Sequence, residues 1–202
     1  MIGSAPEAPP YVIKEAARLI REHGLPQSTA LAIARGEACE ADEIDRKEIS
    51  SAANRWRKTP PNEWPPVNPI WNTDEKFYHY SLDGVSAKEF NELYPEIDVI
   101  KIVTNDILSN LHFGSTRDDP LGEQYIDKSA NIYEYWRRGL PTSPPFIEVY
   151  KGAEILIIGG THRFYLAHYM VCAEIPFLVS RNDSAQLNAI ISGCSSAPPP
   201  AE

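Results

Sequence analysis

The residues best suited to chemistry stand together at Gly159, Gly160, Thr161, His162 and Arg163, between an apolar stretch and a helix-like stretch. Two glycines allow backbone dihedrals that other residues avoid, and they leave room for a ligand against the main chain. A helix beginning at Thr161 or His162 would point unpaired amides and the positive end of its dipole at that spot. Thr161 adds a hydroxyl, and Arg163 can fork onto two phosphate oxygens. This pattern predicts a phosphate-binding cradle.

The same residues also fit an ordinary turn between a strand and a helix. In that interpretation Thr161 is only the N-cap of the helix, and Arg163 is solvated. A single junction of strand, glycine and helix is weak evidence for a ligand site. On these five residues alone, both interpretations stay open.

The elements that must position the cradle follow from periodicity and from turn and stop residues. A β-branched run predicts a strand, and an amphipathic run that ends in basic residues, Gly139 and Pro141 predicts a helix with a clear stop. Two apolar runs that flank Lys-Gly-Ala predict a hairpin. The predicted elements are a strand at 97–103, a helix at 123–139, hairpin strands at 145–150 and 154–158, a helix at 161–172 and a strand at 175–180.

The order of these pieces resembles the ParB/sulfiredoxin superfamily. The matching stretches are IDVIKIVTNDILSN, YWRRGLPTSPPFIEV, ILIIGGTHRFYLAHYM and AEIPFLV, which cover about residues 96–182. The resemblance implies an α/β (α+β) domain with a small mixed sheet and flanking helices. It implies that Gly159, Gly160, Thr161, His162 and Arg163 hold the phosphates of a nucleotide or of a DNA backbone. His162 and Arg163 are then the candidate catalytic residues.

The loop after the first strand often supplies a second arginine in such domains. Here that residue is Arg117, and the adjacent Asp118 and Asp119 are candidate carboxylate ligands for a metal such as Mg²⁺. The alternative is a solvated loop in which these charges pair locally.

Two departures narrow the implied function. Thr161 stands where sulfiredoxins carry their reactive cysteine, and a hydroxyl cannot replace a thiolate in attack on oxidised sulfur. The Glu-Asn element and the helical DNA-reading domain of partition ParB proteins do not follow the last predicted strand. The resemblance then implies a stand-alone hydrolase of phosphate esters, an ATPase, a DNase or both, that uses ATP or another nucleoside triphosphate with Mg²⁺.

The biological role implied by such stand-alone members is fertility inhibition, in which plasmid DNA transfer through a type IV secretion system is blocked. One alternative is a non-catalytic adaptor that senses a nucleotide and docks on secretion or partition machinery. A second alternative is a ParB-like DNA-binding regulator. For that role Gln27, Ser28 and Arg35 are the candidate DNA-reading residues, because HGLPQSTALAIARGE resembles a helix-turn-helix junction. A helical cap explains the same stretch.

The domain boundaries follow from composition. We expect a flexible arm at 1–10, a three-helix region at 11–58, a proline-rich linker at 59–71, the α/β domain at 72–190 and a disordered tail at 191–202.

Composition and charge exclude several classes of protein. A net charge of −9 argues against broad, non-specific nucleic-acid binding. Three widely spaced cysteines suggest neither a zinc knuckle nor a disulfide framework. The start of the chain lacks a secretion-signal pattern, and the longest apolar run is far too short to span a bilayer. We therefore expect a cytoplasmic protein that meets a membrane only through a partner.

Overall fold

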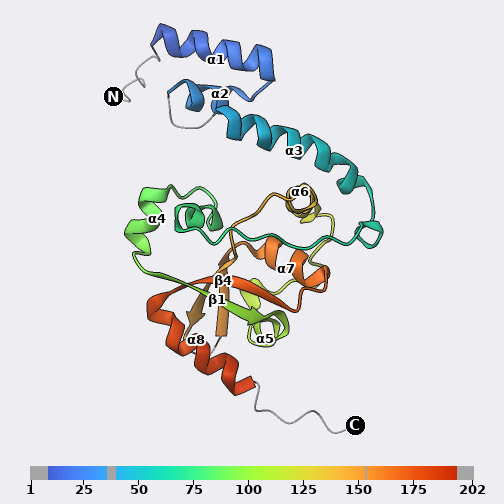
Figure 1. Ribbon diagram of the computed structural model, residues 1–202, viewed down its shortest axis with the longest axis vertical. Coiled ribbons are helices and arrows are strands. Elements are labelled where there is room, and N and C mark those ends of the chain that lie inside the picture. Colours follow the sequence, from blue (N-terminus) through green and yellow to red (C-terminus); the bar gives the residue numbers. More distant parts are fainter. Residues whose placement is uncertain (1–8, 36–39, 153, 195–202) are drawn as a thin grey trace, which may run out of the picture. The chain divides into compact units, whose positions relative to one another are not determined.

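The structure is a computed structural model that describes residues 9–35, 40–152 and 154–194, with side chains at all of these except 40–44 and 193–194 (Figure 1). The chain divides into two compact units, residues 1–54 and residues 55–202. Each unit has its own apolar core.

The first unit is helical. Helix α1 (Pro10–His23) ends at Gly24, whose φ of 58° is left-handed, and α2 (Gln27–Ala34) follows. The apolar core between these helices consists of Ala16, Leu19, Leu25 and Ala30. Helix α3 (Glu40–Lys58) begins in this unit, and the Nζ of Lys47 donates to the carbonyl oxygens that close α1, at His23 and Gly24. The three predicted helices are therefore present.

The second unit is α+β, with helices on both sides of a sheet (Figure 1). Its elements in chain order are η1 (Pro61–Glu63), η2 (Glu75–Ser81), α4 (Ala87–Leu93), β1 (Ile97–Val103), α5 (Thr104–Ser109), η3 (Phe113–Ser115), α6 (Ile126–Arg137), β2 (Phe146–Tyr150), β3 (Glu154–Gly159), α7 (Thr161–Tyr169), β4 (Glu174–Ser180) and α8 (Arg181–Cys194).

The four strands form one mixed sheet in the order β1-β4-β2-β3. β1 and β4 pair antiparallel along their whole length, and β2 and β3 form the predicted antiparallel hairpin. β2 and β4 pair in parallel at Phe146–Leu178 and Ile147–Val179. The expectation of a small mixed sheet with flanking helices is confirmed at this level.

Both faces of the sheet are covered by aromatic side chains. On one face, Tyr78 of η2 and Phe90 of α4 pack against Phe146 and Leu178. On the other face, Phe164 of α7 lies 5.9 Å from Phe177, measured between ring centroids. Burial of these large rings fixes the position of α7, because each removes a large apolar area from water.

Tryptophans hold the proline-rich segment before η2. Trp64 packs against Tyr133 of α6, with ring centroids 4.8 Å apart, and Trp71 packs against Trp136 at 5.3 Å. Residues 69–73, here named the strap, also pair with the chain before β2. The amide of Asn72 donates to the carbonyl oxygen of Thr142, and the amide of Thr142 donates to that of Ile70.

Several predicted element boundaries differ from the structure; the helix predicted for 123–139, for example, is α6 at Ile126–Arg137. The helix predicted for 161–172 ends at Tyr169, and Val171 then adopts a φ of 60° and is exposed. Helix α8 continues to Cys194, four residues into the predicted tail, while 195–202 lie outside the described residues. Residues 1–8 of the predicted arm also lie outside the described residues. Its last residue, Pro10, is the first residue of α1. Among the residues that the structure describes, none of the helices has the length and apolar composition needed to cross a bilayer.

Candidate functional site

The Gly-Gly pair connects β3 directly to α7. Gly160 precedes the helix with a φ of 80°, which a residue with a side chain rarely adopts. The amide of Phe164 donates to the carbonyl oxygen of Gly160 at 3.0 Å as α7 begins. The amides of Thr161, His162 and Arg163 therefore belong to the first turn of the helix, where the dipole favours an anion.

The space beside the two glycines is filled by the chain itself. A Cβ atom on Gly159 would lie 2.2 Å from the carbonyl oxygen of Ser81. A Cβ atom on Gly160 would lie 2.9 Å from the Cα of Pro145. The glycines were expected to leave room for a ligand against the main chain. In the structure they admit two neighbouring backbone segments instead.

Arg163 points inward and serves these same segments. Its side chain is almost fully buried; Nη1 donates to the carbonyl oxygen of Ser143 at 2.6 Å, and Nη2 donates to that of Ser81 at 3.0 Å. Burial lowers its pKa to about 10, so the guanidinium stays charged at neutral pH. The expectation that Arg163 forks onto phosphate oxygens is corrected, as is the alternative that it is solvated, because the side chain is buried and its Nη1 and Nη2 both donate to backbone carbonyl oxygens.

His162 and Arg117 come together in front of α7, although 45 positions separate them. Burial, with further contributions from Arg117 and Lys128, lowers the pKa of His162 to about 4. The imidazole is therefore neutral at pH 7. The ring of Tyr125 lies between the two groups: its centroid is 5.7 Å from that of His162 and 3.8 Å from the Cζ of Arg117.

The loop that carries Arg117 is fixed by a buried tyrosine of α7. The hydroxyl of Tyr165 accepts from the backbone amide of Arg117 at 3.1 Å and donates to the carbonyl oxygen of Ser115 at 3.0 Å. The Nη1 of Arg117 is buried, yet among the residues that the structure describes it has no hydrogen-bond partner. A buried donor atom without a partner is costly even on a half-buried cation, and an anion placed there would accept its hydrogen bond.

The carboxylate of Asp83 interacts electrostatically with Lys128, His162 and Arg163. Asp83 pairs with Lys128 at 2.8 Å, and it influences the pKa of both His162 and Arg163. The pairing with Lys128 is the main cause that lowers the pKa of Asp83. Asp83, Tyr125 and Lys128 were not predicted from the sequence, because each belongs to a different segment and none carries a local motif.

Asp118 and Asp119, the candidate metal ligands, lie in the loop that follows Arg117. Both residues are exposed, and the carbonyl oxygen of Asp119 accepts from the amide of Gly122 at 3.2 Å, which closes a turn. Within 9–35, 40–152 and 154–194, no three histidine, cysteine, aspartate or glutamate side chains gather closely enough to hold a metal ion. Mg²⁺ is usually held by one or two carboxylates together with the phosphates of its nucleotide, so a magnesium site at Asp118 and Asp119 stays a prediction.

The candidate DNA-reading residues lie in the other unit. Gln27 is the first residue of α2, Arg35 follows its last residue, and both are exposed, as is Ser28. Nearby on α1, Arg18 is already paired with Glu15 and Glu22. DNA reading by α2 stays a prediction.

The chain was also compared with known proteins. Neither the protein-family models, nor the curated proteins, nor the solved structures contain a significant match to it. The geometry around His162 and the resemblance in sequence are therefore the observations that bear on function.

Proposed function

We propose that the chain binds the phosphate groups of a nucleotide in front of α7, with Arg117 and His162 as its principal side-chain contacts. The observation that carries the proposal is the buried Nη1 of Arg117, which lacks a partner among the described residues and belongs to the group around His162. A phosphate oxygen would accept a hydrogen bond from this Nη1 and would lie near the positive end of the α7 dipole.

The site residues divide into two roles. The amides and hydroxyl at Thr161 and the neutral ring of His162 offer hydrogen bonds, while Arg117 offers charge. Gly159, Gly160 and Arg163 support the site indirectly, because they fix the start of α7 against Ser81 and Ser143. The proposed site therefore keeps the phosphate ligand predicted from the sequence, but Gly159, Gly160 and Arg163 now support the site instead of contacting the ligand.

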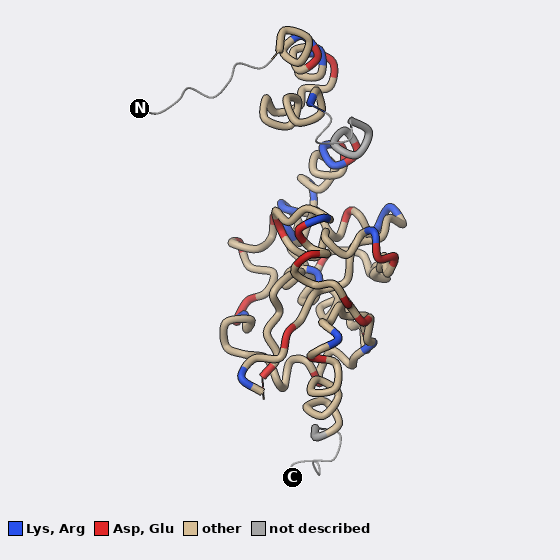
Figure 2. Tube along the Cα trace, turned by 90° about the vertical axis from the view of Figure 1, so that its left-hand side faces the viewer, with Lys and Arg blue, Asp and Glu red and all other residues tan. Residues whose placement is uncertain are grey.

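The charge pattern favours a small ligand over a long nucleic acid. Acidic and basic positions are interspersed along the trace of the unit that contains the sheet (Figure 2). A nucleic-acid surface usually presents a continuous basic stripe. The net charge of −9 also disfavours a long nucleic acid, so a small ligand with one cluster of phosphates fits the protein better.

The binding test compares two arginine variants by calorimetry, with ATP and base-free tripolyphosphate as ligands. We expect both ligands to bind the wild type, and Arg117→Met to weaken each at least about tenfold, which is the scale of one charge-assisted hydrogen bond. The control is Arg181→Met, because Arg181 is exposed and pairs with Glu96 and Asp98. A wild type that binds neither ligand would contradict the proposal, and so would equal affinities for wild type and Arg117→Met.

Hydrolysis of phosphate esters is a second candidate function. The resemblance implies ATPase or DNase activity and inhibition of plasmid transfer, and a neutral imidazole at His162 can accept a proton from water. His162→Gln should then lower turnover of ATP or DNA far more than it lowers nucleotide binding, because the amide of the new side chain can still donate a hydrogen bond to a phosphate. If rigorously purified wild type binds ATP and never hydrolyses it, the nucleotide-sensing adaptor is the better description. A secretion or partition protein would then be its partner.

A further inference from the structure

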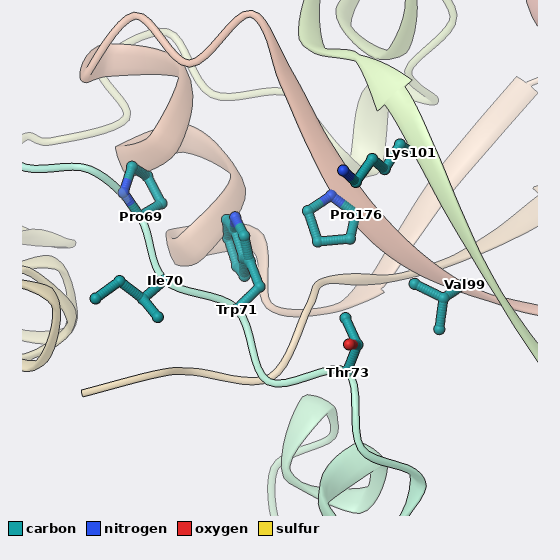
Figure 3. A pocket seen from close by; sticks show the side chains of 7 residues that line it. All are labelled: Pro69, Ile70, Trp71, Thr73, Val99, Lys101 and Pro176. Atoms are coloured by element: carbon teal, nitrogen blue, oxygen red, sulfur yellow. The ribbon is translucent and has the colours of Figure 1, made fainter. Parts of the chain in front are cut away.

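A groove of about 730 Å³ lies between the strap and the β1–β4 pair, and it shares no residue with the proposed phosphate site (Figure 3). Pro69, Ile70 and Trp71 line one side of it. Val99 and Lys101 of β1, with Pro176 of β4, line the other. The volume falls within the range of small-molecule sites, and the lining is mostly apolar, as in such sites.

The groove is open because the cover of this sheet face stops short. Val99 pairs with Leu178, and Lys101 pairs with Pro176, so these four side chains lie on the same face. Leu178 is buried beneath η2 and α4, whereas its partner Val99 on β1 is exposed and lines the groove. The two paired residues that β4 shares with β2 begin at Leu178, so Pro176, which has no amide hydrogen, lies beyond that pairing.

Both walls of the groove are held in place. The strap is fixed by the contact of Trp71 with Trp136 and by its hydrogen bonds with Thr142. The other side is formed by β1 and β4, which pair with each other along their full length. A ligand would therefore enter a preformed site, with little cost for ordering the protein.

Lys101 is the one charged residue that lines the groove. Its side chain is exposed and lies beside Pro176, with the ammonium group on the side of Trp71 (Figure 3). It makes no ion pair with any residue that the structure describes. An unpaired cation at the rim of an apolar groove complements a ligand with a flat apolar body and one negative group.

We propose that this groove binds a small aromatic carboxylic acid. The ring lies against Trp71 and Val99, and the carboxylate accepts hydrogen bonds from the ammonium of Lys101. The proposal is independent of the phosphate site, since the two sites have different residues and different ligand chemistry.

The test uses two probes that differ only in charge, 1-naphthoate and 1-naphthamide, in calorimetric titrations of the full chain. We expect naphthoate to bind the wild type with one site, and Lys101→Met to weaken it at least tenfold. Naphthamide should bind wild type and Lys101→Met equally and more weakly than naphthoate binds the wild type. The matched control is Lys88→Met, an exposed lysine of α4, which should leave both affinities within twofold.

Two further variants keep the test decisive. Lys101→Arg should retain naphthoate binding, because it preserves the charge. Val99→Asp should weaken both probes, because it places a carboxylate in the apolar floor at a half-exposed position that tolerates a polar side chain. The proposal is overturned if naphthoate does not bind the wild type, if Lys101→Met binds it unchanged, or if Val99→Asp binds both probes as the wild type does.

Discussion

The guanidinium of Arg163 donates a 3.0 Å hydrogen bond to the carbonyl oxygen of Ser81, which stands 82 positions earlier in the chain. The same oxygen lies against Gly159, only 2.2 Å from where a Cβ would be. One peptide group thus contacts both a glycine and the arginine of the Gly-Gly-Thr-His-Arg stretch. Gly159 and Arg163 therefore fix the end of η2 against α7, and in the proposed site the contacts with phosphate would come from Thr161, His162 and Arg117 instead.

Gly159→Ala should destabilise the second unit by about 2–3 kcal/mol, the usual scale of overpacking a close contact. The physical reason is the approach of Ser81, because the new methyl group cannot fit without moving backbone. Gly139→Ala is the matched control: its φ is 75° but its Cβ position is open, so only about 1 kcal/mol of dihedral strain is expected. Urea unfolding measures both. Equal losses in the two variants would show that the contact with Ser81 is not what requires glycine.

Arg163→Met should lower the free energy of unfolding by about 3 kcal/mol, since it leaves two buried carbonyl oxygens without donors. Arg181→Met, at an exposed ion pair, should change it by less than about 1 kcal/mol. At a temperature where it stays folded, Arg163→Met should also bind ATP better than Arg117→Met does. A stable Arg163→Met protein that has lost nucleotide binding would instead place the arginine in contact with the ligand.

The stability of the chain should fall as the pH drops from about 6.5 to about 4, in part because of His162. The folded state holds this imidazole at a pKa of about 4, whereas the unfolded chain takes up the proton near 6.5. Between these values the unfolded state binds more protons, so acid favours it. For a half-buried ring we expect about 1–3 kcal/mol. His162→Gln should flatten the dependence in urea titrations at pH 7, 5.5 and 4.5; parallel curves for the two proteins would refute the assignment.

Glu134→Gln should cost about 3 kcal/mol at neutral pH, because it breaks a buried ionic cluster. The carboxylate is fully buried and accepts hydrogen bonds from Arg137, Trp56 and Arg138. The bond from Arg137 is the main cause that holds its pKa well below the usual range. The contribution is therefore complete above about pH 4.5 and is lost as the pH falls further.

The control for this cluster is Glu123→Gln, because Glu123 is exposed. It should leave the free energy of unfolding nearly unchanged. If the two variants unfold at the same urea concentration at pH 7, the cluster does not stabilise the fold as argued. If the difference between wild type and Glu134→Gln persists undiminished at low pH, its origin is not the ionised carboxylate.

Local patterns predicted the elements well where the deciding forces are local. The β-branched run at 97–103 is β1 with the same bounds, and the two runs around Lys-Gly-Ala are the β2–β3 hairpin. Alternation and turn residues suffice there, because neighbours in sequence are also neighbours in space. The end of α6 similarly follows from its basic last turn and Gly139.

Contacts between distant segments could not be predicted in this way. Nothing near Arg163 in the sequence indicates that its donors would meet carbonyl oxygens at Ser81 and Ser143. Tyr125 and Lys128 lie near His162 only because of where the fold places α6 and the residue before it, and the sequence does not indicate that placement. The proximity of Arg117 to His162 was implied only by the resemblance to the ParB/sulfiredoxin superfamily, since residue spacing alone says nothing about it.

The strand order carries a consequence for biosynthesis. β4, the last strand to be translated, occupies an inner position in the sheet between β1 and β2. During synthesis β1 therefore has no β4 to pair with until more than seventy further residues have been translated. Such non-local pairing slows folding and exposes an unpaired strand in the interval. We expect a chain truncated before β4 to depend on chaperones, and to aggregate when they are withdrawn.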